Sequence, residues 1–157
     1  HTDDEGMFEL DSDPLVHRFL GNNPVKSIEQ SRETIRFVMQ QYEIHGIGRW
    51  AVIEKASGKF AGWSGLKFIT HEENGRTRFH DVGYRLIPSF WGKGYATESA
   101  RAAIQYGFEE LKLKEIIGIA HLENTASRRV LEKCELQYAE TYLHQNFPCV
   151  WMKISCR

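Results

Sequence analysis

Two glycines separate a strand-like run from a helix-like run, an arrangement that can bind phosphate. Residues 78–87 alternate in polarity as a strand does, and residues 97–111 repeat with helical spacing. Between them, Gly92 and Gly94 permit the positive φ of a tight turn. The predicted helix begins with unpaired N–H groups and the positive end of its dipole, and Lys93 adds a cation. The pattern predicts a phosphate site, although a turn that binds no ligand can have the same residues.

The spacing matches neither a Walker loop, G-x-x-x-x-G-K-[ST], nor a dinucleotide fingerprint, G-x-G-x-x-G, because Thr97 occupies the third glycine position. Residues 91–98 instead resemble the acetyl-CoA pyrophosphate loop of GNAT-family N-acetyltransferases. The pattern of that loop is Q/R-x-x-G-x-G/A, with Trp91, Gly94 and Ala96 at its three named places. Trp at the first place is usual in the RimJ/RimL-like branch, which acetylates the N-termini of ribosomal proteins.

A second motif resembles the same branch. Residues 123–133 are similar to its N-x-x-S-x-x-V-L-E-K helix. A predicted helix and a predicted strand separate this motif from the glycine loop, which is the order expected in the family. The resemblance to RimJ/RimL-like enzymes covers nearly the whole chain.

The resemblance implies an α/β (α+β) fold of the GNAT type, with a mixed, mostly antiparallel central sheet that is splayed at the cofactor site and flanked by about four helices. We expect a single GNAT domain over residues 1–157, without the family's first strand, because no R-L-x-L-R-like run is present. The hydrophobic pattern agrees, and it predicts that strand 115–120 pairs in parallel with strand 78–87. The other predicted elements are a short helix after Pro14, helices after Ser27 and Asn124, strands at 50–53 and 60–69, and a terminal hairpin of 136–145 and 150–154 with its turn at 146–148.

Composition limits the partners and the location. The 157 residues carry a formal net charge of −1 without a long basic run, which argues against direct binding to nucleic acid. No apolar run reaches transmembrane length, and no signal peptide is visible. Cys134, Cys149 and Cys156 lack metal-ligand spacing, so we expect no metal and a cytoplasmic protein with reduced thiols. The terminal hairpin leaves a homodimer open.

The resemblance also implies that acetyl-CoA is the cosubstrate. The pantetheine arm would pair with the backbone of Leu86 and Ile87, where two strands of the family's sheet splay apart. Asn124 would reach a pantetheine amide or serve only as a helix cap, and one side chain can do both. The pyrophosphate would rest on the loop and helix start formed by Trp91, Gly92, Lys93, Gly94, Tyr95, Ala96 and Thr97.

Direct attack of an amine on a thioester requires a base, an oxyanion donor and an acid for the departing thiolate. A backbone N–H near Leu86 or Ile87 would serve the oxyanion. For the base we favour Asp81, which stands where the branch commonly has Glu in an E-I-G-Y run. A partly desolvated carboxylate on an inner strand has a raised pKa suited to this role. His121 is the second candidate because imidazole titrates near neutral pH. An exposed aspartate and a loop histidine without roles are the alternatives.

The acid and the acceptor pocket have weaker signals. Many GNAT enzymes use a tyrosine in a Y-E-K-x-G-F run, but this chain has Leu131 at that position. Ser127, the serine of N-x-x-S, could protonate the leaving sulfur or act only as a capping hydroxyl. Trp63 and Tyr84 could line an acceptor pocket, with core packing as the alternative for the tryptophan.

We therefore expect a cytoplasmic acetyl-CoA-dependent N-acetyltransferase that acts on a primary amine, with a protein N-terminal α-amine as the first candidate. A small amine or an aminoglycoside-like antibiotic is the nearest alternative acceptor. A sensor that binds acyl-CoA without chemistry is a second hypothesis, because the family's tyrosine is missing. A phosphate-binding domain for another nucleotide is a third, and the asparagine helix argues against it.

Overall fold

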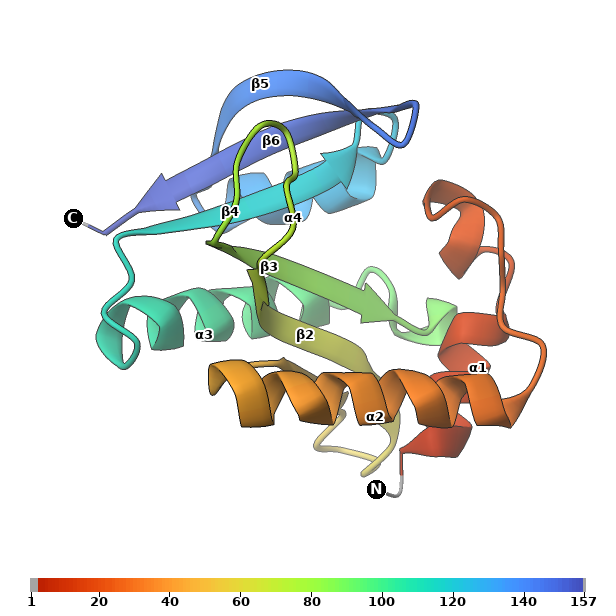
Figure 1. Ribbon diagram of the computed structural model, residues 1–157. Coiled ribbons are helices and arrows are strands. Elements are labelled where there is room, and N and C mark those ends of the chain that lie inside the picture. The colour runs from red at the N-terminus through yellow and green to blue at the C-terminus, as the bar shows by residue number, and fades with distance from the viewer. Residues whose placement is uncertain (1–2, 157) are drawn as a thin grey trace.

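The computed structural model describes residues 3–156 and contains one six-stranded sheet in the order β1-β2-β3-β4-β6-β5 (Figure 1). All neighbouring strands are antiparallel except β3 and β4, which are parallel. This arrangement confirms the predicted mixed, mostly antiparallel sheet and the parallel pair within it. The strands are β1 (Arg49–Ile53), β2 (Phe60–Ile69), β3 (Phe79–Leu86), β4 (Glu115–His121), β5 (Gln137–His144) and β6 (Phe147–Ser155).

Helices pack on both faces of the sheet, as Figure 1 shows. They are α1 (Asp4–Ser12), α2 (Ile28–His45), α3 (Tyr95–Glu109), α4 (Thr125–Lys133) and the short 3₁₀ helices η1 (Val16–Phe19) and η2 (Pro88–Phe90). A large apolar cluster joins α3 and α4 to one face through side chains such as Leu66 and Val82. A smaller cluster joins α1 and η1 to the other face through Ala61 and Ile87. Because alternate residues of a strand point to opposite faces, these two clusters lie on opposite sides of the sheet.

The parallel pair β3–β4 is short. Its register contains only Asp81 with Ile117 and Val82 with Gly118, whereas β3 continues to Leu86 and β4 to His121. The two strands therefore diverge after Val82, which is the splay that the GNAT resemblance predicts.

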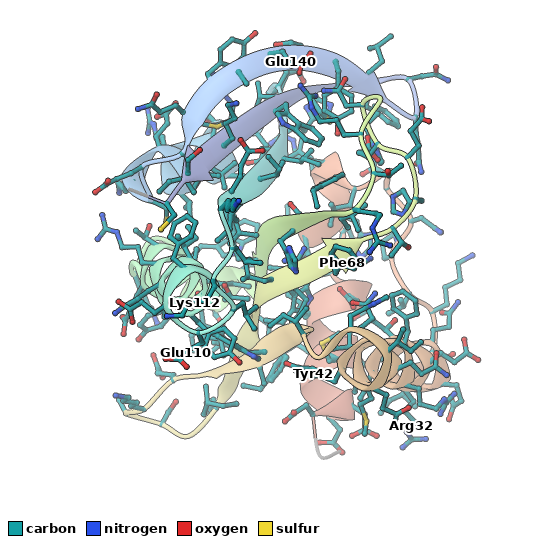
Figure 2. The ribbon with its side chains drawn as sticks, turned by 60° about the vertical axis from the view of Figure 1, so that its left-hand side comes forward. Arg32, Tyr42, Phe68, Glu110, Lys112 and Glu140 are labelled. Atoms are coloured by element: carbon teal, nitrogen blue, oxygen red, sulfur yellow. The ribbon has the colours of Figure 1, made fainter. Side chains whose placement is uncertain are left out.

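Helix α2 is fixed at both of its ends. Ser27 forms the predicted capping box at its start. Arg32 pairs with Asp4 of α1 at 2.8 Å, and the Tyr42 hydroxyl donates to the carbonyl of Arg49 at 3.0 Å. In Figure 2, Arg32 projects from the outer side of α2, and Tyr42 lies between α2 and β1. These contacts hold α2 across the face of the sheet that α1 covers.

Three local features differ from the sequence prediction. The prediction did not include α1, which follows Asp3 and has Asp4 and Glu5 in its first turn but makes no hydrogen bond with a capping side chain. The expected helix after Pro14 is a 3₁₀ helix. The terminal hairpin turns at Gln145 and Asn146, with φ of 47° and 69°, and not at 146–148. Positive φ at both central residues is the requirement of a type I′ turn, which asparagine tolerates.

Gly62 allows β2 to approach the end of β3 closely, and its replacement tests this packing. A Cβ there would overlap the carbonyl oxygen of Arg85 and lie 2.8 Å from the Cα of Leu86. Gly58 also has positive φ, 70°, but nothing lies within 4 Å of its added Cβ. We expect Gly58→Ala to lower the free energy of unfolding by about 1–2 kcal/mol, and Gly62→Ala to lower it by clearly more. Urea denaturation measures both, and equal losses would contradict this account of the strand end.

Candidate active site

The predicted glycine turn forms the start of α3. Gly92 and Gly94 have φ of 73° and 87°, and Gly94 is the residue that caps the helix. The first helical bond runs from the N–H of Glu98 to the carbonyl of Gly94 at 3.0 Å. The N–H groups of residues 95–97 therefore precede the helical bonding pattern and point out of the helix start, where the dipole is positive.

Trp91 connects this turn to the end of β3. Its indole Nε1 donates to the carbonyl oxygen of Leu86 at 2.7 Å, while the side chain stays 48% exposed. The same carbonyl is one of the backbone groups expected to meet pantetheine. The structure therefore gives Trp91 a positioning role that the sequence motif alone does not explain.

Glu54, which the sequence analysis did not identify, holds the other side of the turn. It accepts hydrogen bonds from Ser57 at 2.5 Å and from the Tyr95 hydroxyl at 2.7 Å, and Lys93 Nζ lies 3.9 Å away. The hydrogen bonds from Ser57 and Tyr95 lower the pKa of Glu54, so the carboxylate stays charged. Tyr95 and Lys93 thus connect the candidate phosphate loop to the β1–β2 turn. No sequence signal links Glu54 to the loop because the contact is non-local.

At the end of β3, successive residues direct their backbone N–H and C=O groups alternately toward β2 and toward the gap between β3 and β4. The N–H of Ile87 donates to the carbonyl of Ala61 at 2.9 Å, so it points toward β2. Alternate residues of a strand direct their backbone groups to opposite sides. The groups of Tyr84 and Leu86 therefore point toward the gap between β3 and β4. The N–H of Ile87 is therefore engaged and does not serve as the oxyanion donor, so of the two residues expected to supply it Leu86 is the remaining candidate.

The structure brings three predicted residues together at the start of α4. Asn124 Oδ1 accepts the N–H of Ser127 at 3.1 Å, as expected of the cap, and its amide NH₂ remains for another partner. The Tyr84 hydroxyl donates to the Ser127 carbonyl at 2.7 Å and lies 3.1 Å from Ser127 Oγ. Burial raises the pKa of Tyr84 above its ordinary value, so this hydroxyl stays protonated. Tyr84, on β3, therefore fixes the position of Ser127 at the start of α4.

Asp81 lies on the opposite face and is paired with Arg49, a residue that the sequence analysis missed. Arg49 Nη2 lies 2.6 Å from Asp81 Oδ2, and Nη1 donates to the Asp81 carbonyl at 2.9 Å and to the Gly65 carbonyl. Burial raises the pKa of Asp81, while Arg49 acts in the opposite direction. Gly83 makes room for this pair, because a Cβ there would lie 2.6 Å from Arg49 Nη2.

Trp63 and Tyr84 do not share a pocket. Trp63 stands opposite Arg85 in the β2–β3 register, and Ser64 stands opposite Tyr84, so the two aromatic side chains point to different faces. The Trp63 ring packs against guanidinium groups, with Arg49 at 5.3 Å and Arg85 at 5.1 Å from the ring centroid. The Trp63 ring, which we expected to line an acceptor pocket, therefore packs against two arginine side chains.

His121 ends β4 and has one nitrogen already engaged. Its Nδ1 accepts the N–H of Glu123 at 3.1 Å. Its ring lies 5.2 Å from that of Phe19 in η1 and 6.1 Å from that of Phe147 in β6. Because a backbone N–H can only donate, the neutral imidazole carries its proton on Nε2. In this tautomer His121 offers a donor and no free acceptor nitrogen.

Within residues 3–156, no cluster of three or more His, Cys, Asp or Glu side chains is arranged to hold a metal ion. In the same part of the chain, no helix is both long enough and apolar enough to span a membrane.

Comparison with known proteins identifies the family. The model of the acetyltransferase (GNAT) domain matches residues 1–137. The chain therefore belongs to the GNAT family of acetyltransferases.

Relatives in this family have diverse printed activities. The FsC-acetyl coenzyme A-N(2)-transacetylase of Aspergillus fumigatus is 34% identical over 149 residues, 92% of this chain but only 63% of that protein. The chain thus spans less than two thirds of this relative's length. The putative ribosomal N-acetyltransferase YdaF of Bacillus subtilis is 32% identical over 117 residues, which are 73% of this chain and 60% of the length of YdaF. The spermidine N-acetyltransferase of Vibrio cholerae, solved with CoA and spermine, has the same fold, with a TM-score of 0.76 and 19% identity over 98% of this chain and 89% of that one.

Substitution of Gly94 tests the glycine turn as the acetyl-CoA site. Gly94→Trp should block the space beside the N–H groups of residues 95–97 and abolish binding of acetyl-CoA in calorimetric titration. Gly75→Trp is the matched control, since Gly75 also has positive φ, 68°, with nothing within 4 Å of an added Cβ. Unchanged affinity in Gly94→Trp, or equal loss in both variants, would contradict the assignment.

Proposed function

We propose that this acetyltransferase acts by direct attack of a primary amine on the thioester of acetyl-CoA, and that the first candidate acceptor is a protein N-terminal α-amine. One observation carries the proposal: β3 and β4 diverge directly before the glycine turn that starts α3. A cosubstrate can then place its phosphates on the turn and its thioester in the gap, where an amine can reach it from the other face.

Four groups of the chain would hold the cosubstrate in that orientation. The N–H groups of residues 92–97 would bind the pyrophosphate, with Lys93 as a cation released from its 3.9 Å contact with Glu54. Backbone groups of Tyr84 and Leu86 would pair with the pantetheine arm and supply the oxyanion donor. The free NH₂ of Asn124 would donate to a pantetheine carbonyl while Oδ1 continues to cap α4.

Asp81 is the base that we favour. Its raised pKa makes it a better proton acceptor than an ordinary aspartate, and Arg49 holds its carboxylate in one orientation. The thioester would lie beside the backbone of Tyr84, which is three residues beyond Asp81 on β3 and therefore about 10 Å away at the rise of a strand. The proton of the attacking amine would therefore reach Asp81 through water. His121 is a weaker base because its Nδ1 is engaged. Ser127, fixed by Tyr84, would protonate the leaving thiolate.

Different observations favour different acceptors. The RimJ/RimL-like motifs and the similarity to YdaF favour a protein N-terminus. The transacetylase of Aspergillus fumigatus and the spermidine enzyme, by their names, favour a small-molecule amine. Leu131, which replaces the family's tyrosine, keeps a non-catalytic acyl-CoA sensor as the rival from another class.

Thermal shift with acetyl-CoA, CoA, ATP and NAD, followed by thiol release with N-terminal peptides, polyamines and aminoglycosides, tests the function. We expect stabilisation by both CoA species and thiol release with one class of amine. Stabilisation without release for any amine would favour the sensor. Stabilisation by ATP or NAD alone would overturn the assignment of the glycine turn.

Asp81→Asn tests the base. A base works when deprotonated, and the raised pKa of Asp81 moves the rising limb of the pH–rate profile above its ordinary value of 3.8. The variant should lose that limb and about 100-fold in kcat at low to neutral pH, with CoA affinity unchanged. At alkaline pH the amine loses its own proton, so the difference should narrow.

Asp11→Asn is the matched control for this variant. Asp11 is a buried carboxylate on α1 that pairs with Arg85 at 2.7 Å, so its loss also breaks a carboxylate–arginine pair. The control should keep the rising limb even if its unfolding temperature falls. An unaltered profile in Asp81→Asn would transfer the base role to His121 or to water.

A further inference from the structure

His17, in η1, is a buried imidazole without hydrogen bonds. The residue is only 7% exposed, and neither Nδ1 nor Nε2 has a partner among the residues that the structure describes. A buried polar group without a partner destabilises a fold, and native proteins retain few of them. Such a group is therefore a candidate for contact with a ligand.

The position of η1 gives this imidazole a context. Val16 belongs to the apolar cluster that contains Ile87 and Phe90, just after the end of β3. The ring of Phe19 lies 5.2 Å from that of His121, at the end of β4. His17 stands between Val16 and Phe19 in the chain. The four-residue η1 therefore bridges the two strands at the place where they have diverged, and Figure 1 shows it on the side toward which β3 and β4 run.

The face of the sheet indicates which reactant His17 would meet. Asp81 of β3 pairs with Ile117 of β4. Four residues further along each strand, Arg85 and His121 lie at the same height along the sheet, and Ile87 follows two residues later. At this level η1 covers the face opposite α3, the same face as Asp81. Since the candidate phosphate loop belongs to the start of α3, an acceptor would approach the gap from the face that η1 covers.

We propose that His17 is a contact residue for the acceptor amine, with one ring nitrogen accepting a hydrogen bond from the attacking amine. A neutral imidazole has one acceptor and one donor nitrogen. In His121 the acceptor nitrogen is engaged by Glu123, whereas in His17 it is unpartnered. Because both nitrogens are covered, binding requires a change of rotamer in His17 or in a neighbour. The inference rests on the proposed function, since it assumes an amine acceptor.

The test compares His17→Leu and His17→Gln in the intact chain, using the amine that supports thiol release by the wild-type enzyme. His17→Leu removes the unpartnered polar atoms and keeps an apolar side chain, so its unfolding temperature should be equal or higher. Its KM for the amine should rise about tenfold, the size of one net hydrogen bond, with the Kd for CoA unchanged. His17→Gln, which keeps an acceptor and a donor, should recover most of the loss in KM.

His80→Leu is the matched control. His80 is a half-buried imidazole on β3 whose ring lies 4.9 Å from that of Phe68. It points to the face of the sheet away from η1, with Val82. This variant should leave the KM for the amine unchanged. A rise in KM in His17→Leu alone would then be due to the place of His17 beside the gap, and not to the loss of a partly buried imidazole as such.

Each alternative outcome decides the question. An unchanged KM in His17→Leu, or a lower unfolding temperature with failure of His17→Gln to recover activity, would mean that His17 only packs. A weaker Kd for CoA with unchanged KM for the amine would move His17 to the cosubstrate and overturn the inference. If the wild-type enzyme released no thiol with any amine, the proposed function would fail, and this inference with it.

Discussion

The pairing of β3 with β4 is limited to two residue pairs, and the geometry of the site depends on that limit. Beyond Val82 the backbone of Tyr84 and Leu86 has no neighbouring strand on the β4 side, so it faces a gap at the centre of the sheet. Unpaired backbone inside a protein is costly. Trp91 reduces the cost at one point by donating to the Leu86 carbonyl. Pairing of the remaining groups with an extended, amide-containing ligand such as the pantetheine arm that we propose would offset the rest.

Charge is distributed unequally between the two faces of the gap. The α3 side presents the positive end of a helix and Lys93, suited to phosphates. The α1 side contains Asp81 in an ion pair with Arg49, both largely buried. A buried pair contributes little net stability, but it keeps a carboxylate oriented in a desolvated place. Burial raises the pKa of Asp81, and the neighbouring Arg49 acts in the opposite direction. An oriented, desolvated carboxylate suits the role of base that we propose for it.

The sequence predicts the local features well and the non-local ones poorly. The glycine turn, the Ser27 capping box and the Asn124 cap each depend on residues within a few positions, so their spacing is visible in the chain. The contacts of Arg49 with Asp81 and of Glu54 with Tyr95 span 32 and 41 residues, and nothing in the sequence pattern requires them. The paired assignment of Trp63 and Tyr84 to one pocket failed for a related reason. It needed the register of two strands, and a shift of one residue reverses the face.

Hydrogen bonds distinguish His121, at the end of β4, from His17, in η1, in a way that residue type cannot. His121 has the more suggestive place in the sequence, directly after a buried strand, yet Glu123 occupies its Nδ1 and fixes its tautomer as a donor. His17 lies in a short 3₁₀ helix without any motif, yet both of its nitrogens are unpartnered. An acceptor nitrogen is useful to an incoming amine only while nothing else binds it. The hydrogen bonds therefore leave an acceptor nitrogen in His17, for which we propose contact with the amine, and none in neutral His121, which makes His121 the weaker candidate for the base.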